Sequence, residues 1–287
     1  MLGVIGGSGV YALPELAAGD SVEMETPFGV PSGPLRVGRI GRTDIAFVPR
    51  HGPGHRFSPT DLPYRANVYA LKLLGVTHVL SISAVGSLLE PLPPRTRVVP
   101  DQIIDRTVQR PRTFFEDGVV AHVGMADPYC PLLRSAVERA GAANDTPVHM
   151  DGTYVCIEGP QFSTRAESRL FRSWGGAVIG MTAMPEARLA REAELCYATL
   201  ALVTDYDVWH DDERDVSVEL VLEHLRANSA AAAGIVRVLA EAGVPDRGCG
   251  CGRALDGAVM TDPTAIDDET RRRLGVVGAR LVPPTSA

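Results

Sequence analysis

The sequence predicts an α/β protein, in which buried strands alternate with amphipathic helices along the chain. Short apolar runs recur between stretches with helical periodicity, and this alternation is typical of α/β folds. Several runs are continuous Val/Ile/Leu segments, as expected for strands covered on both faces. With 287 residues, 45% of them hydrophobic, the chain can bury a substantial core. We expect one domain over residues 1–287, least regular after about residue 243.

Strands are expected where an apolar run is bounded by glycine, proline or polar residues. These runs lie at residues 2–5, 45–49, 78–83, 97–100, 153–157, 177–179 and 197–203. The Pro- and Gly-containing clusters at residues 31–34, 53–55 and 91–94 are expected to be loops.

Helices are expected where apolar residues recur at helical spacing, at residues 64–74, 131–140, 165–173, 185–193 and 217–241. The last pattern is the clearest. Val218, Val221, Leu222 and Leu225 fall on one face, and Ser217 can cap the first turn.

Composition excludes several functions. The net charge of −7 argues against non-specific nucleic-acid binding, which needs clustered basic residues facing phosphates. Lys72 is the one lysine, within an apolar helical stretch, so a Schiff-base lysine and a P-loop are not expected. The N-terminus lacks the basic segment of a secretory signal, and no apolar run approaches the roughly 20 residues of a membrane span. We expect a cytoplasmic protein.

The five cysteines do not predict a metal site. Cys130, Cys156 and Cys196 are scattered through segments expected to be buried, where free cysteine is common. Cys249 and Cys251 form a C-x-C pair that lacks the second ligand pair of a structural zinc site. A redox or disulfide role for this pair stays open, and an incidental pair is the expectation.

Residues suited to binding an anion follow four of the predicted strands. Ser8 lies in a glycine-lined turn, Arg50 and His51 follow the strand at 45–49, and Ser83 and Thr182 end or follow two others. Hydroxyl groups, backbone N–H groups and an arginine fork are ligands for phosphate. Because open α/β sheets bind ligands at strand carboxyl ends, we expect these residues to form one phosphate site.

Two other interpretations of the same segments are weaker. Gly7, Gly9 and Ala12 match a dinucleotide fingerprint, but Pro14 interrupts the helix that should follow, and no acidic strand end comes about 20 residues later. A zinc site at His51 and His55 would need a helix that the intervening glycines and proline prevent.

Asp205 and Asp207 come directly after the apolar strand at 197–203. Two carboxylates placed there are costly unless they are exposed or used, and each raises the pKa of the other. They predict an acid/base site beside the phosphate site.

The sequence resembles the methylthioadenosine phosphorylase branch of the trimeric purine nucleoside phosphorylases. The similarity is carried, in order from Gly3 to about His210, by GVIGGSGV, ETPFGVPS, PRHGPGH, ISAVGSL, DQIIDRT, IEGPQFSTRAES, GMTAMPEA and TDYDVWH, and VSVELVLEHL continues it. Beyond about Leu239 it is weakest, and Ser8 stands where many relatives have threonine.

The resemblance implies an α/β fold with a central mixed sheet flanked by helices, and reversible cleavage of the glycosidic bond of 5′-methylthioadenosine by inorganic phosphate. The products would be adenine and 5-methylthioribose 1-phosphate, with phosphate as a co-substrate and no cofactor. A homotrimer is implied, either single or doubled into a hexamer.

The resemblance also implies which residues form the site. The phosphate set is Ser8, Arg50, His51, Ser83, Ala84 and Thr182. The substrate set is Phe162, Ser163, Met181, Asp205, Tyr206, Asp207, Val218, Val221 and His122. In it, Met181 lies under the ribose, Phe162 packs on the base, Val218 and Val221 form the 5′ pocket, and His122 comes from a neighbouring subunit.

Our mechanistic hypothesis is that Asp205 is the acid at purine N7 and that Asp207 supports it. Three rival functions stay open. A 6-oxopurine or broad-specificity phosphorylase would act on methylthioinosine, inosine or adenosine. However, a 6-oxo group is a hydrogen-bond acceptor, and its lone pairs would face those of the two carboxylates. A nicotinamide-dependent oxidoreductase would use the Gly7–Ala12 match, and a nucleoside-binding protein would need no chemistry.

Overall fold

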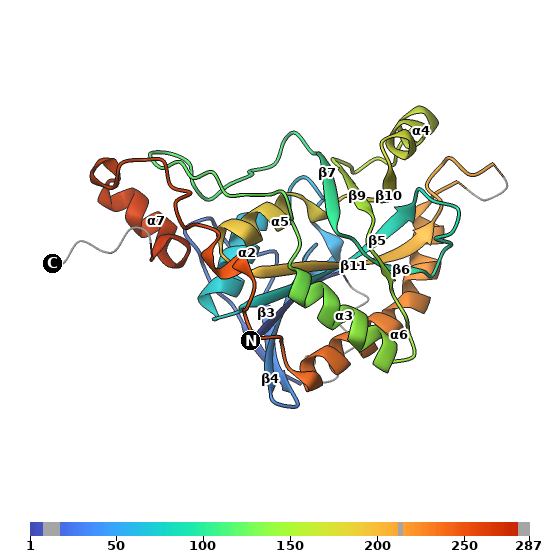
Figure 1. Cartoon of the computed structure of the whole chain (residues 1–287), viewed down its shortest axis with the longest axis horizontal. Helices are drawn as coiled ribbons and strands as arrows, with labels where there is room; N and C mark the ends of the chain where they lie inside the picture. Colours follow the sequence, from blue (N-terminus) through green and yellow to red (C-terminus); the bar gives the residue numbers. More distant parts are fainter. Residues whose placement is uncertain (8–17, 212–214, 281–287) are drawn as a thin grey trace.

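A mixed β-sheet organises the computed structural model, which describes residues 1–7, 18–211 and 215–280. Its strands run in the order β2-β3-β4-β1-β5-β10-β9-β7, with β11 paired to β5 and β6, and β6 to β8 (Figure 1). Their bounds are β1 (Leu2–Gly6), β2 (Asp20–Val22), β3 (Leu35–Ile40), β4 (Thr43–Pro49), β5 (His78–Ser87), β6 (Arg97–Val99), β7 (Gln102–Arg106), β8 (His149–Met150), β9 (Thr153–Ile157), β10 (Gly176–Gly180) and β11 (Cys196–Asp205).

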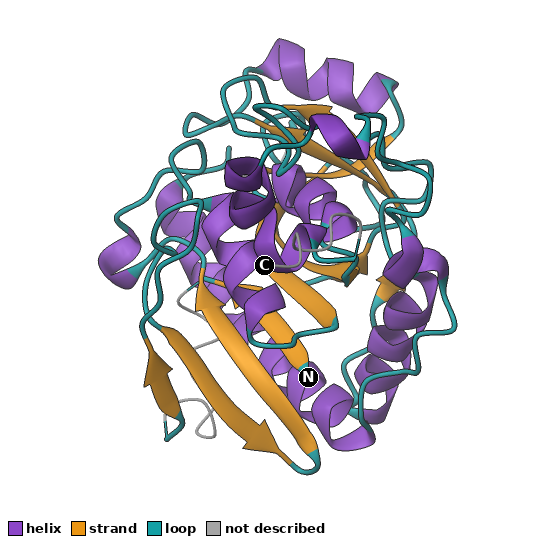
Figure 2. Cartoon of the chain, turned by 90° about the vertical axis from the view of Figure 1, so that its left-hand side faces the viewer, coloured by secondary structure: helices purple, strands orange, loops and turns teal. Residues whose placement is uncertain are grey.

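Helices cover both faces of this sheet (Figures 1 and 2). They are α2 (Tyr64–Leu73), α3 (Pro131–Ala143), α4 (Arg165–Ser173), α5 (Ala183–Glu192), α6 (Val218–Ala242) and α7 (Asp268–Gly278), with short 3₁₀ turns η1 (Pro53–His55), η2 (Gly250–Arg253) and η3 (Pro263–Ala265). Helices α2, α5 and α7 contribute to one buried apolar core, and α3 and α6 to the other. The predicted α/β class with a mixed sheet is confirmed.

The long strand β5 changes its neighbour on one edge, and this change opens the sheet. It pairs in parallel with β1 as far as Ser81, then in antiparallel with β10 from Gly86 onward. Along the other edge it pairs with β11 throughout. On this edge, the stretch from Ser83 to Val85 therefore lies after the end of the pairing with β1 and before the start of the pairing with β10. Such a topological switch is where α/β sheets bind ligands.

The predicted elements recur, most of them with shifted ends. The helix predicted at 165–173 has those bounds, because Thr164 and Glu167 form a capping box at its start. Ser217 caps α6 as predicted, accepting a hydrogen bond from the N–H of Leu220. Strands β5 and β11 extend beyond the predicted ends at Ser83 and Val203, because each gains further ladder pairs near the switch in β5.

Several elements were missed, and they lie at the margins of the sheet or after Gly243. Strands β2, β3, β7 and β8 carry charged or half-exposed residues, so the continuous apolar pattern of a covered strand is absent. Helix α7 packs on α2, with Leu274 fully buried, although the sequence predicted no element there. Within the described ranges, no helix is long and apolar enough to span a bilayer.

Candidate active site

A cavity of about 300 Å³ opens beside the switch in β5, where β1, β4, β10 and β11 also end. Its wall contains most of the predicted site residues: Arg50, His51, Ser83, Ala84, Phe162, Ser163, Met181, Thr182, Asp205, Asp207, Val218 and Val221. They come from segments separated by up to 171 residues of sequence, between Arg50 and Val221. The structure thus brings the expected anion ligands and the expected carboxylates to one place.

Of the other three predicted residues, one is not described and two lie elsewhere. Ser8, like most of the dinucleotide-type match, lies outside the described residues. Tyr206 points away from the cavity, and its hydroxyl donates a hydrogen bond to the carbonyl of Glu90 at 3.0 Å. His122 is exposed elsewhere on the chain, in a loop that pairs with the segment around Val259.

Arg50 anchors the floor of the cavity, although its side chain is almost wholly buried. Its Nη1 donates to the Ile82 carbonyl at 2.7 Å, and Nη2 donates to Ser81 Oγ at 2.6 Å and to the Ile5 carbonyl at 3.2 Å. The Glu186 carboxylate accepts from Nε at 3.2 Å and from Nη2 at 3.3 Å. Burial acts to lower the pKa of Arg50, but Glu186 raises it above its ordinary value, so the guanidinium is charged. The second Nη1 proton has no partner within the described ranges.

Two hydroxyl groups in the cavity wall lack partners. Ser83 Oγ and Thr182 Oγ1 are both buried, and neither has a hydrogen-bond partner among the described residues. The buried Tyr154 hydroxyl lies close to both and makes no hydrogen bond of normal geometry among the described residues. Burial raises the pKa of Tyr154 to about 12, so it remains a donor. Since unpaired buried hydroxyls are costly, these groups are suited to a polar ligand that fills the cavity.

His51 lies in the same wall as a neutral ring. Burial lowers its pKa to about 4, and its Nδ1 lies 3.0 Å from the Phe57 carbonyl. A carbonyl can only accept, so Nδ1 carries the proton and Nε2 is an acceptor. The His51 and His55 rings stack with centroids 4.0 Å apart.

Asp205 is a buried carboxyl group held from two sides. The Thr204 hydroxyl donates to Oδ2 at 2.7 Å, and the backbone N–H of Asp207 donates to Oδ1 at 2.8 Å. Burial nevertheless raises the pKa of Asp205 to about 6. Gly86 makes room for it, because a Cβ on that glycine would lie 2.8 Å from Asp205 Oδ1.

Asp207 follows in a left-handed backbone conformation, with φ of 52°. This turn lets its N–H bond back to Asp205 while its own carboxyl lines the cavity. Burial raises its pKa, and the nearby hydroxyls of Ser168 and Ser163 partly oppose this rise. Neither hydroxyl makes a hydrogen bond of normal geometry to the buried Oδ2 in the part of the chain described. The two aspartates therefore differ: both Asp205 oxygens accept hydrogen bonds from within the chain, whereas Oδ2 of Asp207 accepts none of normal geometry among the described residues.

The mouth of the cavity is apolar and open. Phe162, Val218 and Leu222 line it and are 41%, 65% and 45% exposed. Large apolar side chains gathered at a cavity mouth mark a place where a ligand or another chain binds.

Sequence reasoning missed two charged residues that position the site. Glu186 pairs with Arg50, and it could have been found as an acidic residue in the first turn of a buried helix. The almost fully buried Arg110 donates from Nη1 to the carbonyls of Met181 and Met184 at 2.7 and 2.6 Å, and it pairs with Glu158. It fixes the segment that carries Thr182, but in the sequence it looks like any loop arginine.

A fold of this class with such a cavity fits the phosphorylases. The family model described as "Phosphorylase superfamily" matches residues 1–241, so the chain is a member of that superfamily.

Comparison with individual relatives shows to which family within the superfamily the chain belongs. The chain is 50% identical over 286 residues to a protein of Gloeobacter violaceus, covering 97% of this chain and 95% of that one. It is 49% identical over 278 residues to a protein of Geobacter sulfurreducens, covering 96% and 97%. Both are named S-methyl-5′-thioadenosine phosphorylase, and the chain belongs to their family, as the sequence resemblance indicated.

Solved structures of the same family are similar to this chain over most of its length. A methylthioadenosine phosphorylase from an Antarctic soil metagenomic library superposes with a TM-score of 0.91 at 47% identity, covering 96% of this chain and 98% of that one. The methylthioadenosine phosphorylase of Schistosoma mansoni, solved in complex with adenine, gives 0.84 at 37% identity, covering 93% and 99%.

The Arg50–Glu186 pair generates a stability prediction. Glu186→Gln leaves a buried guanidinium without its counter-charge, so we expect the free energy of unfolding to fall by about 3–5 kcal/mol in urea titrations. The control is Asp44→Asn, which breaks the exposed Arg39–Asp44 pair and should cost less than about 1 kcal/mol. Equal losses in the two variants would contradict the central role of the buried pair.

Proposed function

We propose that this enzyme catalyses the reversible phosphorolysis of S-methyl-5′-thioadenosine to adenine and 5-methylthioribose 1-phosphate. One observation carries the proposal: unpartnered anion donors and a raised-pKa carboxyl pair share a single cavity. The names of the relatives support the same substrate. The reaction would serve purine and methionine salvage. Because it changes no oxidation state, it needs inorganic phosphate and no redox cofactor.

The phosphate would be held by the predicted set Ser8, Arg50, His51, Ser83, Ala84 and Thr182. The Ser83 and Thr182 hydroxyls support this, since both are buried donors in the cavity wall without an acceptor among the described residues. Nη1 of Arg50, which lines the same wall, bonds only to the Ile82 carbonyl within those residues. Neutral His51 would accept a hydrogen bond from a protonated phosphate oxygen. Because Glu186 already balances Arg50, neutral donors would supply much of the binding, which suits a co-substrate that must also leave.

In the reaction, a phosphate oxygen forms a bond to C1′ while the C1′–N9 bond breaks and its electron pair moves into the purine. The sugar passes through an oxocarbenium-like state, which the phosphate anion stabilises. Asp205 would donate a proton to N7, where the negative charge of the leaving base gathers. A pKa of about 6 leaves it partly protonated near neutral pH, as a general acid requires.

The unused Oδ2 of Asp207 favours a 6-aminopurine. It can accept a hydrogen bond from the 6-amino group, whereas a 6-oxo group would place two acceptors together. Phe162 would pack on the base and Met181 would lie under the ribose, both from the cavity wall. Ser163 lies beside Asp207 in that wall and would help to hold it.

The 5′ group would lie against α6. Val218 and Val221 line the cavity there and fit a methylthio group. An apolar pocket rejects an added hydroxyl only modestly, on the order of 100-fold, so adenosine is expected to be a slower substrate.

We further propose a cytoplasmic homotrimer, single or doubled, in which a neighbouring subunit covers the cavity mouth. The exposed Phe162, Val218 and Leu222 support a covering chain, and the exposed His122 would be its contribution. No disulfide joins the five cysteines, which suits a reducing compartment. Tyr206 would act by bracing the aspartate turn through Glu90 rather than by touching substrate.

The first test is release of the base from methylthioadenosine, methylthioinosine, adenosine and inosine, each with and without inorganic phosphate. We expect phosphate-dependent release, with the highest kcat/KM for methylthioadenosine. Faster hypoxanthine release would overturn the assignment of Asp207, and no release at all would leave a binding protein.

The variant Asp205→Asn tests whether Asp205 is the acid that protonates purine N7. We expect kcat for methylthioadenosine to fall by about 10²–10⁴-fold, since an amide cannot protonate N7. In the wild type, kcat/KM should decline as pH rises through about 6, and the variant should lose this inflection. The control is Asp211→Asn on the exposed surface nearby.

Asp205→Asn should also change how the free energy of unfolding depends on pH. A carboxyl whose folded pKa is raised favours folding most at low pH and loses that contribution as pH rises through about 6. The wild type should therefore lose stability relative to Asp205→Asn between pH 4 and pH 7. A pH-independent difference would contradict a buried, raised-pKa acid.

A mixed-subunit experiment tests the shared site. His122→Ala and Asp205→Asn chains should each be nearly inactive alone. If His122 completes a neighbour's site, co-refolded mixtures will contain some sites with both native residues and regain activity. Light scattering should show a trimer or hexamer; a monomer, or no regain of activity, contradicts the shared site.

A further inference from the structure

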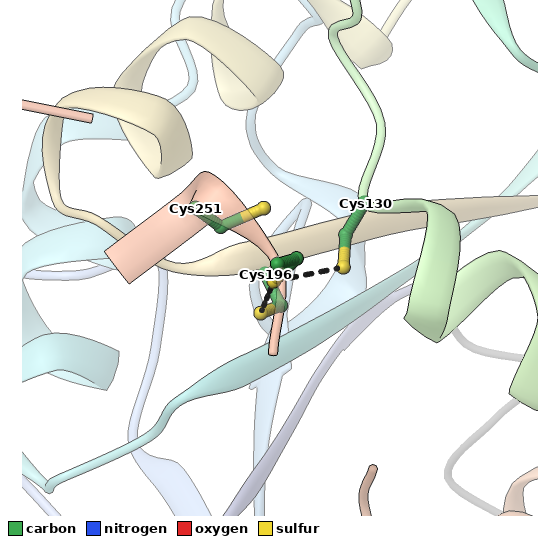
Figure 3. Close-up of side chains that lie close together, drawn as sticks. Cys130, Cys196 and Cys251 are labelled. Carbon is green, nitrogen blue, oxygen red and sulfur yellow. Dashed lines mark hydrogen bonds between the residues drawn. The ribbon is translucent and has the colours of Figure 1, made fainter. Parts of the chain in front are cut away.

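Four of the five cysteines meet at one point, although they come from distant parts of the sequence. Cys130 immediately precedes α3, Cys196 begins β11 and Cys251 lies in η2 (Figure 3). Cys249 lies immediately before η2. Their Sγ atoms all lie within 4.8 Å of one another. Cys130 and Cys196 are buried, as expected, but nothing in the sequence indicated that the fold brings them to Cys249 and Cys251 as the second pair that C-x-C lacks. We call this set the four-cysteine cluster.

The spacing of the sulfurs suits a shared metal ion. The Cys196–Cys249 and Cys130–Cys249 Sγ atoms are 3.5 and 3.7 Å apart. A disulfide would need about 2.05 Å. Around one zinc ion, with zinc–sulfur bonds of about 2.3 Å, tetrahedral sulfurs lie about 3.8 Å apart. Two of the six sulfur–sulfur distances thus match the edge of a tetrahedral thiolate site, and all six lie within 4.8 Å, so side-chain adjustments would close the cluster around an ion.

The surroundings suit a site with thiolate ligands. Cys130, Cys196 and Cys251 are buried in the core formed by α3, α6 and the sheet, and half-buried Cys249 leaves a route for an ion. Arg191 Nη1 lies 3.8 Å from Cys251 Sγ and offsets negative charge.

We propose that the four-cysteine cluster binds one zinc ion as a structural site. Four zinc–sulfur bonds form, the thiol protons leave to water, and no sulfur changes oxidation state. All-thiolate tetrahedral coordination is typical of closed structural zinc sites, whereas a catalytic zinc keeps an open position. None of the four cysteines lines the substrate cavity, so the site is separate from the proposed chemistry.

The ion would fasten the C-terminal segment to the sheet. The chain that follows Cys251 pairs with the loop of His122 through the Ala121–Val259 bridge and through the His122 N–H bonded to the Ala258 carbonyl at 2.8 Å. It then places Leu274 of α7 in the core. Zinc would hold both the tail and the loop that carries His122.

The test is metal content, which does not depend on activity. Wild-type protein, grown with zinc and purified without chelators under argon, should contain about one zinc per chain by elemental mass spectrometry. Replacement by Co²⁺ should give the absorption of tetrahedral cobalt–thiolate. Cys249→Ser, chosen because Cys249 is half-buried and its loss should be tolerated, should lower zinc content at least tenfold.

The matched control is Cys156→Ser, since Cys156 is the fifth cysteine and lies outside the cluster. It should retain zinc and the cobalt spectrum. Wild-type protein that stays metal-free after incubation with zinc, or that shows disulfides among these cysteines in non-reducing mass spectrometry, would overturn the proposal. The zinc content and the disulfide state that would overturn the proposal are both measured on the wild type, so misfolding of a variant cannot decide the outcome.

Discussion

The buried ion pair of Arg50 and Glu186 is the interaction on which the active-site end of the sheet depends. The guanidinium follows β4, yet it bonds to the backbone of β1 and β5 and to a helix that follows β10. The Tyr197 hydroxyl of β11 adds a bond to Glu186 at 2.9 Å. Two charges thereby fix the relative positions of the strands that line the cavity. Removing either charge alone would leave the other buried and unpaired, so the two residues constrain each other.

The change of neighbours along β5 then creates the place where a ligand fits. A strand paired on both edges to its end would fill the region with backbone hydrogen bonds. Instead, β1 ends its pairing at Ser81 and β10 begins at Gly86, and the side chains between them face a cavity. Gly86 also admits the Asp205 carboxyl against the strand. In the proposed reaction, this one irregularity sets the phosphate site and the acid side by side.

The segment after Gly243 connects the four-cysteine cluster to the loop that carries His122. Its cysteines lie against α3 and β11, its bridge at Val259 supports the loop of His122, and α7 completes a core. The proposed zinc ion and the proposed intersubunit contact would therefore act through the same stretch of chain. Its regular structure depends on long-range partners, which explains why its local sequence has weak periodicity.

The sequence by itself determined the covered strands, the capped helices, and the residues that follow the strands, including Arg50, Ser83, Thr182 and Asp205. These features are local, because apolar runs, Ser217 and Thr164 caps, and polar strand ends are legible in adjacent residues. Only the tertiary structure decided that Glu186 pairs with Arg50 and that Tyr206 turns away from the cavity. It also decided that Cys130 and Cys196 join Cys249 and Cys251. Such contacts join residues far apart in sequence, and only the packed sheet fixes which side chains share one neighbourhood.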